Sequence, residues 1–493
     1  MHSHRGTTER KMPPVLADLQ PIELWKHFVQ LSAIPRASTQ EAAAREYVRS
    51  VANKLGLESI EDHSGNLIVR KPAHPGRESA PTTLLQAHLD MVCEKNEGTA
   101  HNFDTDPIRL VRDGDWVKAD GTTLGADNGI GVAAALTVME TKNLSHGPLE
   151  FAFTIDEERG LTGASEFEPG LLESRYYLNL DNEETDTLCI GCAGGLNTTL
   201  RRKLTLLPAS GDSAYRLKVS GLHGGHSGVD IHQGRGNAIC ILGSVLLDLL
   251  DRLPLQLASI NGGSAHNAIP REAVAIIALP ASRADELRSL VLSAAGAHQA
   301  DLGAFDPELQ ITVTKTELPA RIFGAADAKN TAAVLVSLPH GVLSMSPDVP
   351  DLVQTSTNIA TVTTQGDLLT IGTSQRSAIA SSKDAAAHRV ATVGRLAGFE
   401  IEHDSRYPGW KPEPDSELTH KMQAAHQKLF GHPAKLIAMH AGLECGVIGE
   451  KYPGMQMISF GPTIVSPHSP KERVQISSVQ SFWSYLTVVL ESL

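Results

Sequence analysis

The 493-residue sequence lacks three features that would each indicate a class of protein. No apolar run approaches the ~20 residues that a membrane-spanning helix needs. No basic patch stands out and the formal net charge is −13, so nucleic-acid binding has little support. The polar N-terminus has no hydrophobic signal segment, and residues 1–13 are expected to be a loose leader. We therefore expect neither a membrane nor a nucleic acid as partner, and the acidity serves solubility.

Cysteine is also scarce, with five residues at scattered positions. An odd, scattered set argues against a disulfide framework and agrees with a location in the reducing cytoplasm. Cys189 and Cys192 form a lone CxxC, without a second pair at zinc-ribbon spacing. We interpret them as two cysteines of a strand, with a redox role as the lesser alternative.

The first 200 residues alternate helical and strand-like patterns, and the chain is long enough for two or three domains. A capping box at Ser38–Glu41 is expected to open a helix. Three apolar runs predict strands that end on polar residues, at 81–88, 149–155 and 176–180. Strands that alternate with helices favour an α/β fold with a mostly parallel sheet.

The pattern changes near Leu200, where glycine-rich turns begin to separate strand-like segments. Residues 196–398 are expected to form an α+β unit. Residues 1–195 and 399–493 are then two parts of one catalytic domain, if His468 joins the site described next. No internal repeat or low-complexity tract is evident.

Polar residues with metal-binding side chains stand at the ends of these strands or beside them. The segments are His88-Leu89-Asp90, Asp127 within Gly125–Gly131, Asp156-Glu157-Glu158, Asp181, and His468. Taken singly, each has an ordinary explanation, such as a helix N-cap for Asp127 or a solvated surface for the paired glutamates. Taken together they indicate one site, because ligands gather beyond the carboxyl ends of parallel strands.

The residue types favour a site for two divalent metal ions. Such a site needs a bridging carboxylate and a few nitrogen or oxygen ligands on each ion. Asp127 is the expected bridge, with His88 and Asp181 on one ion and Glu158 and His468 on the other. Imidazole and carboxylate ligands suit zinc, with cobalt or manganese as alternatives.

Two further carboxylates have expected roles beside the ions. Asp90 follows His88 by two residues, which places both side chains on one face of a strand, so Asp90 can fix the histidine tautomer. Glu157 and Glu158 are adjacent and face opposite ways in an extended chain. One can therefore bind metal while the other acts as the general base that activates a water bridging the ions.

The sequence resembles the M20 family of dinuclear-zinc peptidases, and within that family it is most similar to the aminoacyl-histidine dipeptidases. The matching motifs run nearly end to end. They are Leu31–Arg36, Gln86–Val92, Leu124–Gly131, Asp156–Glu158, Asn179–Asp181, Gly224–Gly228, His440–Gly446, and Gly461–Thr463 with Ser466–Pro470. The HxD, central aspartate and Glu-Glu set belongs to the superfamily, while the stretches from His440 and Gly461 point to the dipeptidase branch.

The resemblance implies a zinc-exopeptidase catalytic domain with an inserted lid, a dipeptide substrate such as β-Ala-His, and specific roles for the residues above. The five ligands are as expected from the residues, Glu157 is the base, and Asp90 orients His88. The family pattern adds His226 as a lid histidine that stabilises the oxyanion. It also adds Arg376, with Asn267 nearby, as the group that binds the substrate carboxylate, and a cis peptide after Asp127.

Rival functions stay open at this point. The same scaffold supports N-acyl amino acid deacylases and tripeptidases, which a substrate panel would separate. A metal- or peptide-binding paralogue without activity is a rival of another class, although a binding protein has no need of a free base beside a full ligand set. A homodimer is the favoured assembly, and His226 then acts either within its own subunit or on the partner's site.

Overall fold

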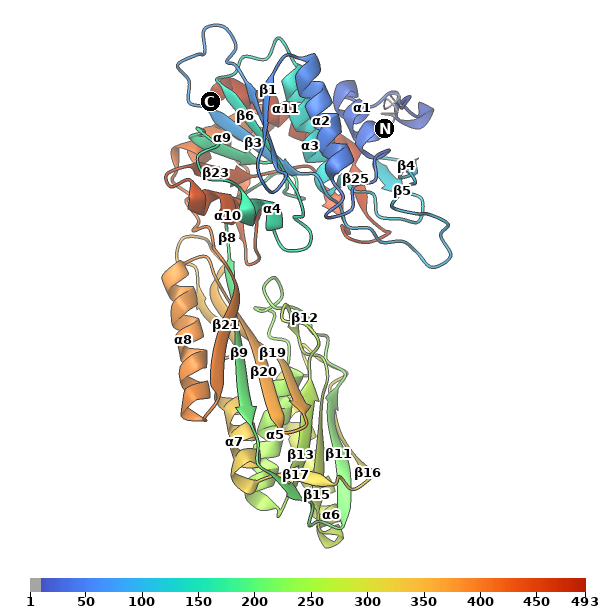
Figure 1. Ribbon diagram of the computed structural model, residues 1–493, viewed down its shortest axis with the longest axis vertical. Coiled ribbons are helices and arrows are strands. Elements are labelled where there is room, and N and C mark those ends of the chain that lie inside the picture. Colours follow the sequence, from blue (N-terminus) through green and yellow to red (C-terminus); the bar gives the residue numbers. More distant parts are fainter. Residues whose placement is uncertain (1–9) are drawn as a thin grey trace. The chain divides into compact units, whose positions relative to one another are not determined.

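The computed structural model describes residues 10–493, which divide into two compact units (Figure 1). Of the described residues, the first unit comprises 10–191, 412–438 and 443–493, and the second comprises 192–411 and 439–442. The predicted domain boundaries remain a prediction. Strand pairing places the segment Glu400–Tyr407 in the second unit, because it pairs along the strand Gly194–Lys203, whereas the sequence analysis assigned it to the last part of the catalytic domain.

The first unit is built around an eight-stranded sheet in the order β1-β2-β6-β3-β7-β23-β8-β22. Its strands are β1 (Glu58–Glu61), β2 (Leu67–Lys71), β3 (Thr83–His88), β6 (Leu149–Thr154), β7 (Tyr176–Asn179), β8 (Thr187–Cys192), β22 (Lys435–Met439) and β23 (Gln456–Ser459). The four central strands, from β6 to β23, are parallel, while β1, β2 and β8 pair antiparallel with their neighbours. The α/β class is confirmed, but the sheet is mixed, with a parallel centre.

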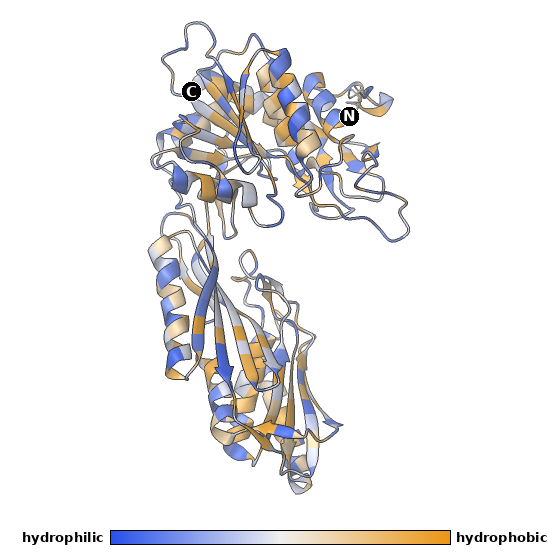
Figure 2. Cartoon of the chain, in the orientation of Figure 1, coloured by the Kyte–Doolittle hydropathy of each residue, from blue (hydrophilic) through white to orange (hydrophobic). Residues whose placement is uncertain are grey.

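Helices cover this sheet, and apolar residues gather along its strands (Figure 2). The helices are α1 (Ile22–Leu31), α2 (Ala42–Lys54), α3 (Ala126–Glu140), α4 (Thr162–Glu166), α9 (Glu417–Phe430), α10 (Glu444–Lys451) and α11 (Ile476–Ser492). Helix α3 packs on β3 and α1, and nearly all of its residues are buried. Strands β3, β6 and β7 are also buried at every position. The centre of the sheet is therefore part of the hydrophobic core, as in parallel sheets covered by helices on both faces.

Short elements complete the first unit. They are the 3-10 turn η1 (Pro14–Leu16) and a four-stranded sheet of β4 (Leu110–Asp113), β5 (Trp116–Ala119), β24 (Ile464–Val465) and β25 (Arg473–Gln475). The pairing of β25 with β5 ties the loop that contains His468 to the segment that precedes α3. None of the helices in residues 10–493 is long and apolar enough to cross a membrane.

The predicted capping box is wrong, and its residues serve another purpose. Helix α2 begins after Glu41, which makes no side-chain cap, and Thr39 has a left-handed backbone with φ 71°. Ser38 Oγ donates a hydrogen bond to Asp90 Oδ2 at 2.7 Å. Glu41 Oε1 accepts one from the backbone N–H of Asp156 at 3.0 Å. Both side chains are used by long-range contacts to the ends of β3 and β6.

The second unit is a large antiparallel sheet with helices on one face. The sheet comprises β9 (Gly194–Lys203), β11 (Ser213–Ser220), β13 (Gln256–Gly262), β15 (Ala273–Leu279), β16 (Gln310–Thr316), β18 (Gly341–Met345), β19 (Val353–Gln365), β20 (Leu368–Ser377) and β21 (Glu400–Tyr407). The helices are α5 (Ala238–Arg252), α6 (Ala284–Leu302), α7 (Ala325–Ser337) and α8 (Ala380–Leu396), with the turn η2 (Ala281–Arg283). Because α5 contacts α6 and α7, and α7 contacts α8, the four helices share a face and a core.

Two short ladders lie beside that sheet. Strands β10 (Leu206–Pro208) and β17 (Arg321–Phe323) form one, and β12 (Gly225–His226) and β14 (Ala268–Ile269) form the other. The second ladder carries His226 opposite Ala268, which places the backbone of Asn267 next to this histidine.

Candidate metal centre

The parallel strands of the first unit deliver polar side chains to one edge of the sheet. In the β3–β6 register His88 lies opposite Thr154, two residues before Asp156, and in the β3–β7 register Gln86 lies opposite Asn179, two residues before Asp181. The three strands therefore end almost level, and the residues that follow them meet at the same edge.

His88 is the centre of one group of ligand atoms. Its imidazole is buried, and its Nε2 lies 3.0 Å from Asp127 Oδ1 and 3.3 Å from Asp181 Oδ1. Asn128 Nδ2 donates to Asp181 Oδ1 and, at 2.8 Å, to the carbonyl of Leu180, which holds the Asp181 loop against the start of α3. The expected cis peptide bond between Asp127 and Asn128 is confirmed.

His468 is the centre of a second group, although it is more than 280 residues from Asp181 in the sequence. Its Nε2 lies 3.0 Å from Asp127 Oδ2 and 2.9 Å from Glu158 Oε2. Asp127 therefore directs one oxygen to each histidine. Ligand atoms of His88, Asp127 and Asp181 lie within 4.8 Å of one another, and so do those of Asp127, Glu158 and His468. The five predicted ligands come together as two overlapping sets that share Asp127.

Asp90 fixes the surroundings of His88. Its Oδ1 lies 3.3 Å from His88 Nδ1 and accepts from the backbone N–H of Glu157 at 3.1 Å. Its Oδ2 accepts from the backbone N–H of Glu158 at 3.2 Å. Although burial opposes it, hydrogen bonding from His88 and Ser38 lowers the pKa of Asp90 to about 2. This carboxylate therefore binds the backbone of the Glu-Glu segment and faces the imidazole of His88, which is where a residue that orients the ring would lie.

The electrostatics of the cluster favour cations. Burial raises the pKa of Asp181 to about 6 and raises that of Glu157 well above its usual range. Hydrogen bonds with Asp127 and Glu158 raise the pKa of His468 to about 11. Glu158 Oε1 is buried and has no hydrogen-bond partner. A set of oxygen and imidazole ligands with crowded carboxylates and an unpartnered buried oxygen fits a pair of divalent ions.

Two residues that position the site escaped the sequence analysis. Glu472 is buried, and its carboxylate accepts hydrogen bonds from the backbone N–H groups of Leu124, Gly125, Ala126 and Asp127 at 2.7–3.4 Å. Arg36 donates from Nη1 to the carbonyls of Leu89 and Asp90 at 2.9 and 2.8 Å, and from Nη2 to that of Gly125. Arg36 belongs to the motif Leu31–Arg36 that matches the family, so the sequence offered a reason to examine it. Glu472 lies in no such motif, and no sequence pattern indicated its role.

The predicted lid residues lie in the second unit. Gly228 separates His226 from Arg376, because a Cβ built at this glycine would lie 3.1 Å from His226 Cε1 and 3.2 Å from Arg376 Cδ. Arg376 is buried, donates from Nη1 to Tyr407 Oη at 2.8 Å, and has no partner at Nε. Asn267 is exposed, and its carbonyl accepts from Ser227 N at 2.8 Å. The structure therefore gathers His226, Arg376 and the Asn267 backbone around one turn.

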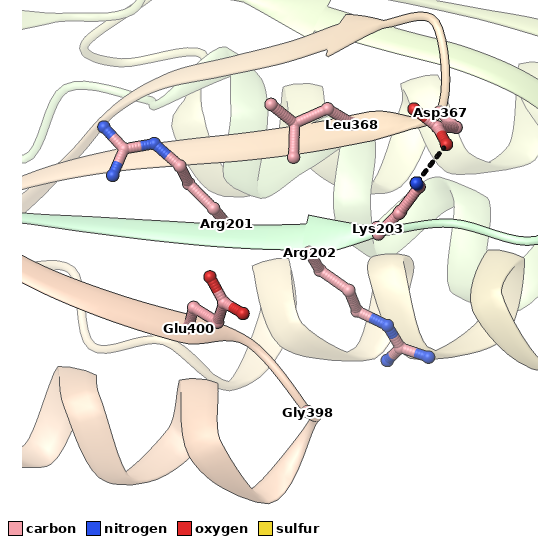
Figure 3. A pocket seen from close by; sticks show the side chains of 7 residues that line it. All are labelled: Arg201, Arg202, Lys203, Asp367, Leu368, Gly398 and Glu400. Atoms are coloured by element: carbon pink, nitrogen blue, oxygen red, sulfur yellow. Dashed lines mark ion pairs between the residues drawn. The ribbon is translucent and has the colours of Figure 1, made fainter.

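A separate hollow of about 620 Å³ in the second unit carries none of the predicted residues (Figure 3). It is lined by Arg201, Arg202, Lys203, Asp367, Leu368, Gly398 and Glu400. Its three cations are paired with acids, Arg201 with Glu402, Arg202 with Asp327, and Lys203 with Asp367 at 3.4 Å. Because these charges are already matched, the hollow is not a built anion site.

Imidazole and carboxylate donors gathered at the carboxyl edge of an α/β sheet define a candidate metallohydrolase. Comparison with known proteins agrees with this class. The sequence model of peptidase family M20/M25/M40 matches residues 84–492. The chain therefore belongs to this family and is a peptidase, and the resemblance stated from the sequence is confirmed.

Individual relatives are similar over nearly the whole chain. The cytosol non-specific dipeptidase of Escherichia coli is 40% identical over 97% of this chain and 99% of its own length. The crystal structure of aminoacylhistidine dipeptidase from Vibrio alginolyticus superposes with a TM-score of 0.91 and 41% identity, covering 97% of this chain and 98% of that one. The aminopeptidase PepT of Bacillus cereus shares the fold with a TM-score of 0.56 and 16% identity over 96% of this chain and 99% of that one.

Proposed function

We propose that the protein hydrolyses dipeptides at a centre of two divalent metal ions. The observation that carries this proposal is the position of Asp127, whose two oxygens face histidines of two different ligand sets. His88 and Asp181 would hold one ion, Glu158 and His468 the other, and Asp127 both. When bound, such ions polarise a carbonyl oxygen and lower the pKa of a water molecule, and zinc is the ion that these ligands suit best.

Glu157 is the proposed general base and acid. A ligand atom of Glu157 lies within 4.8 Å of those of His88 and Glu158, and its backbone N–H is held by Asp90. Burial raises its pKa, so a carboxylate near the ions is poised to exchange a proton. In the proposed reaction Glu157 takes a proton from the attacking water and delivers it to the leaving amine.

The second unit supplies the proposed substrate-binding groups. Arg376 binds the carboxylate of the dipeptide, for which its buried guanidinium with an unpartnered Nε is suited, and Asn267 assists. His226 donates a hydrogen bond to the oxyanion that forms during attack. Whether His226 serves its own subunit or that of a homodimer partner is a question for experiment.

The substrate class is proposed from the two relatives that are 40% and 41% identical over 97% of this chain, both of which are named dipeptidases. One name specifies aminoacylhistidine and the other a non-specific activity, so Xaa-His dipeptides such as β-Ala-His are proposed as substrates among others. The name of the Escherichia coli relative includes the word cytosol, and a cytoplasmic location is proposed here on that ground. N-acyl amino acids and tripeptides are the competing substrates.

Hydrolysis of β-Ala-His and Gly-His by the purified protein tests this function. The protein is assayed as purified, after EDTA, and after EDTA followed by zinc, with N-acetyl amino acids and tripeptides in parallel. We expect dipeptide cleavage that EDTA abolishes and zinc restores. Cleavage of N-acetyl amino acids alone would replace the proposal by a deacylase, and binding of metal without any hydrolysis would favour the non-catalytic alternative.

A further inference from the structure

A single buried carboxylate closes both ends of the loop that carries His226. Asp306 follows α6 and its side chain is fully buried, at 0% exposure. Its Oδ1 accepts from the backbone N–H of His223 at 2.7 Å and lies 3.1 Å from the Nδ1 of the same residue. Its Oδ2 accepts from the backbone N–H of Gly236 at 2.6 Å. Charge-assisted bonds of this kind are about twice as strong as neutral ones, so Asp306 fixes the span of the loop.

Inside this closed loop a second carboxylate holds the backbone of His226. Asp230 Oδ2 accepts from the N–H of His226 at 2.8 Å. Arg235 braces the same turn, because its Nη1 lies 3.8 Å from Asp230 Oδ2 and donates to the carbonyl of Gly224. The backbone position of His226 is therefore set by contacts within residues 224–235, which lie between the two residues that Asp306 binds.

The loop also determines which ring nitrogen of His226 carries the proton. The backbone N–H groups of Gly228 and Val229 donate to His226 Nδ1 at 3.2 and 3.0 Å. A ring nitrogen that accepts hydrogen bonds carries no proton, so the neutral imidazole has its proton on Nε2. Burial and the charge of Arg376 lower the pKa of His226, which favours this neutral form. Nε2 is then a hydrogen-bond donor, as stabilisation of an oxyanion requires.

We propose that Asp306 is a positioning residue for His226, which it keeps in the orientation and Nε2–H tautomer needed to stabilise the oxyanion. Asp306 acts through the loop, since its carboxylate is occupied by His223 and Gly236. This inference rests on the proposed role of His226. Without the carboxylate the backbone N–H groups of His223 and Gly236 lose their acceptor, and the two ends of the loop that carries His226 are no longer held together.

A double-mutant cycle on the zinc-loaded, full-length protein tests the inference. Gly-His hydrolysis is measured for the wild type, Asp306→Ala, His226→Ala and the double variant. We expect His226→Ala to lower kcat about 10²–10³-fold, as loss of one oxyanion donor does. Asp306→Ala should lower kcat at least tenfold with little change in KM, and it should have no further effect in the His226→Ala background.

Asp306→Asn provides a milder variant in case the alanine variant folds poorly. It keeps one acceptor oxygen, and we expect part of kcat to be retained. Asp327→Ala is the matched control, because Asp327 is another buried aspartate of the second unit but binds Thr205 N, at 2.8 Å, and Arg202. The control should lower stability without changing kcat.

Nuclear magnetic resonance of ¹³C,¹⁵N-histidine-labelled protein reads the tautomer directly, with the His226 signal assigned from its absence in His226→Ala. We expect the Nε2–H form in the wild type and a mixture in Asp306→Asn. Unchanged kcat and an unchanged His226 signal in both Asp306 variants would overturn the inference, and so would an equal loss of kcat in the His226→Ala background. If His226→Ala keeps full kcat, the oxyanion role fails, and the His226 signal still decides whether Asp306 controls the ring.

Discussion

At the scale of single residues, the site depends on carboxylates whose two oxygens contact different partners. Asp127 divides its oxygens between His88 and His468, and Asp90 divides its own between the imidazole of His88 and the backbone of the Glu-Glu segment. The adjacent Glu157 and Glu158 also have different surroundings. Glu158 Oε2 contacts His468, whereas Glu157 is the proposed base. The two neighbouring glutamates are therefore proposed to have different functions.

Replacing these two glutamates separately tests that separation. Glu157→Gln should lower kcat about 10²–10⁴-fold, because it removes the base but none of the five ligands. Its metal content, measured by atomic emission on the purified protein, should equal that of the wild type. Glu158→Gln is the contrasting variant and should lose metal at the His468 side. Near-wild-type turnover in Glu157→Gln would rule out this residue as the base.

His440 is expected to make the stability of the protein depend on pH. It is 7% exposed, and its Nε2 lies 2.7 Å from Ser356 Oγ. Burial, followed by the charge of Arg376, lowers its pKa to about 3, against about 6.5 for histidine in an unfolded chain. The unfolded state therefore binds one more proton between these values, so stability present above pH 6.5 is lost as pH falls towards 3.

Urea unfolding of the chelator-treated protein between pH 6 and pH 4 measures this effect. The free energy of unfolding should fall with decreasing pH in both proteins. The slope should be smaller in His440→Asn than in the wild type, by about 1.4 kcal/mol per pH unit. His420, exposed on α9, provides the matched control, and His420→Asn should leave the slope unchanged. Equal slopes in the wild type and His440→Asn would mean that His440 is protonated in the folded protein.

At the scale of elements, the start of α3 is held in place by two buried side chains, Glu472 and Arg36. Glu472 binds four successive backbone N–H groups there, and Arg36 holds the carbonyl of Gly125 from the other side. The first N–H groups of a helix have no partner within the helix, and a carboxylate suits them in both hydrogen bonding and charge. This clamp fixes Asp127, because that residue lies in the bound segment.

Glu472→Gln is expected to loosen this terminus. The amide keeps one acceptor oxygen, so some N–H groups lose their partner, at a cost of about 2–4 kcal/mol in the free energy of unfolding. Zinc affinity, measured by competition with a chromogenic chelator, should fall as well. Glu150→Gln is the control, because buried Glu150 accepts from the backbone N–H groups of Glu173 and Ser174, away from the ligands. It should lower stability and keep zinc affinity, and a Glu472→Gln variant with unchanged affinity would contradict the clamp.

Elements with a local signal could be predicted from the sequence, and elements defined by remote contacts could not. The apolar runs at 81–88, 149–155 and 176–180 were predicted to be strands, and β3, β6 and β7 form there and are buried at every position. The ligands were predicted because each stands at a strand end within a short motif. Glu150 lies between apolar neighbours and would be read as solvent-facing, yet it is buried by contacts to a loop over twenty residues away. Ser38 and Glu472 likewise bind partners that are distant in the sequence, so no local pattern reveals them.

At the scale of the whole molecule, the chain separates metal binding from the proposed substrate binding. The five proposed ligands, Asp90 and Glu157 belong to the first unit, whereas His226, Asn267 and Arg376 belong to the second. Each unit has its own sheet and its own buried apolar residues. Removal of metal should therefore affect the two units unequally.

Hydrogen exchange with and without zinc tests this expectation. A ligand that binds only the folded state stabilises it by RT ln(1 + [L]/Kd), about 2.7 kcal/mol at 100 times Kd. After EDTA treatment, exchange should quicken at the end of β3, the start of α3 and the segments around Glu158, Asp181 and His468. The strands β11, β15 and β16 of the second unit should keep their protection. His468→Ala should reproduce part of the change in the presence of zinc, because it removes a ligand of one ion while Asp181 and His88 remain. Equal loss of protection in both units after EDTA would show that the metal centre also stabilises the second unit.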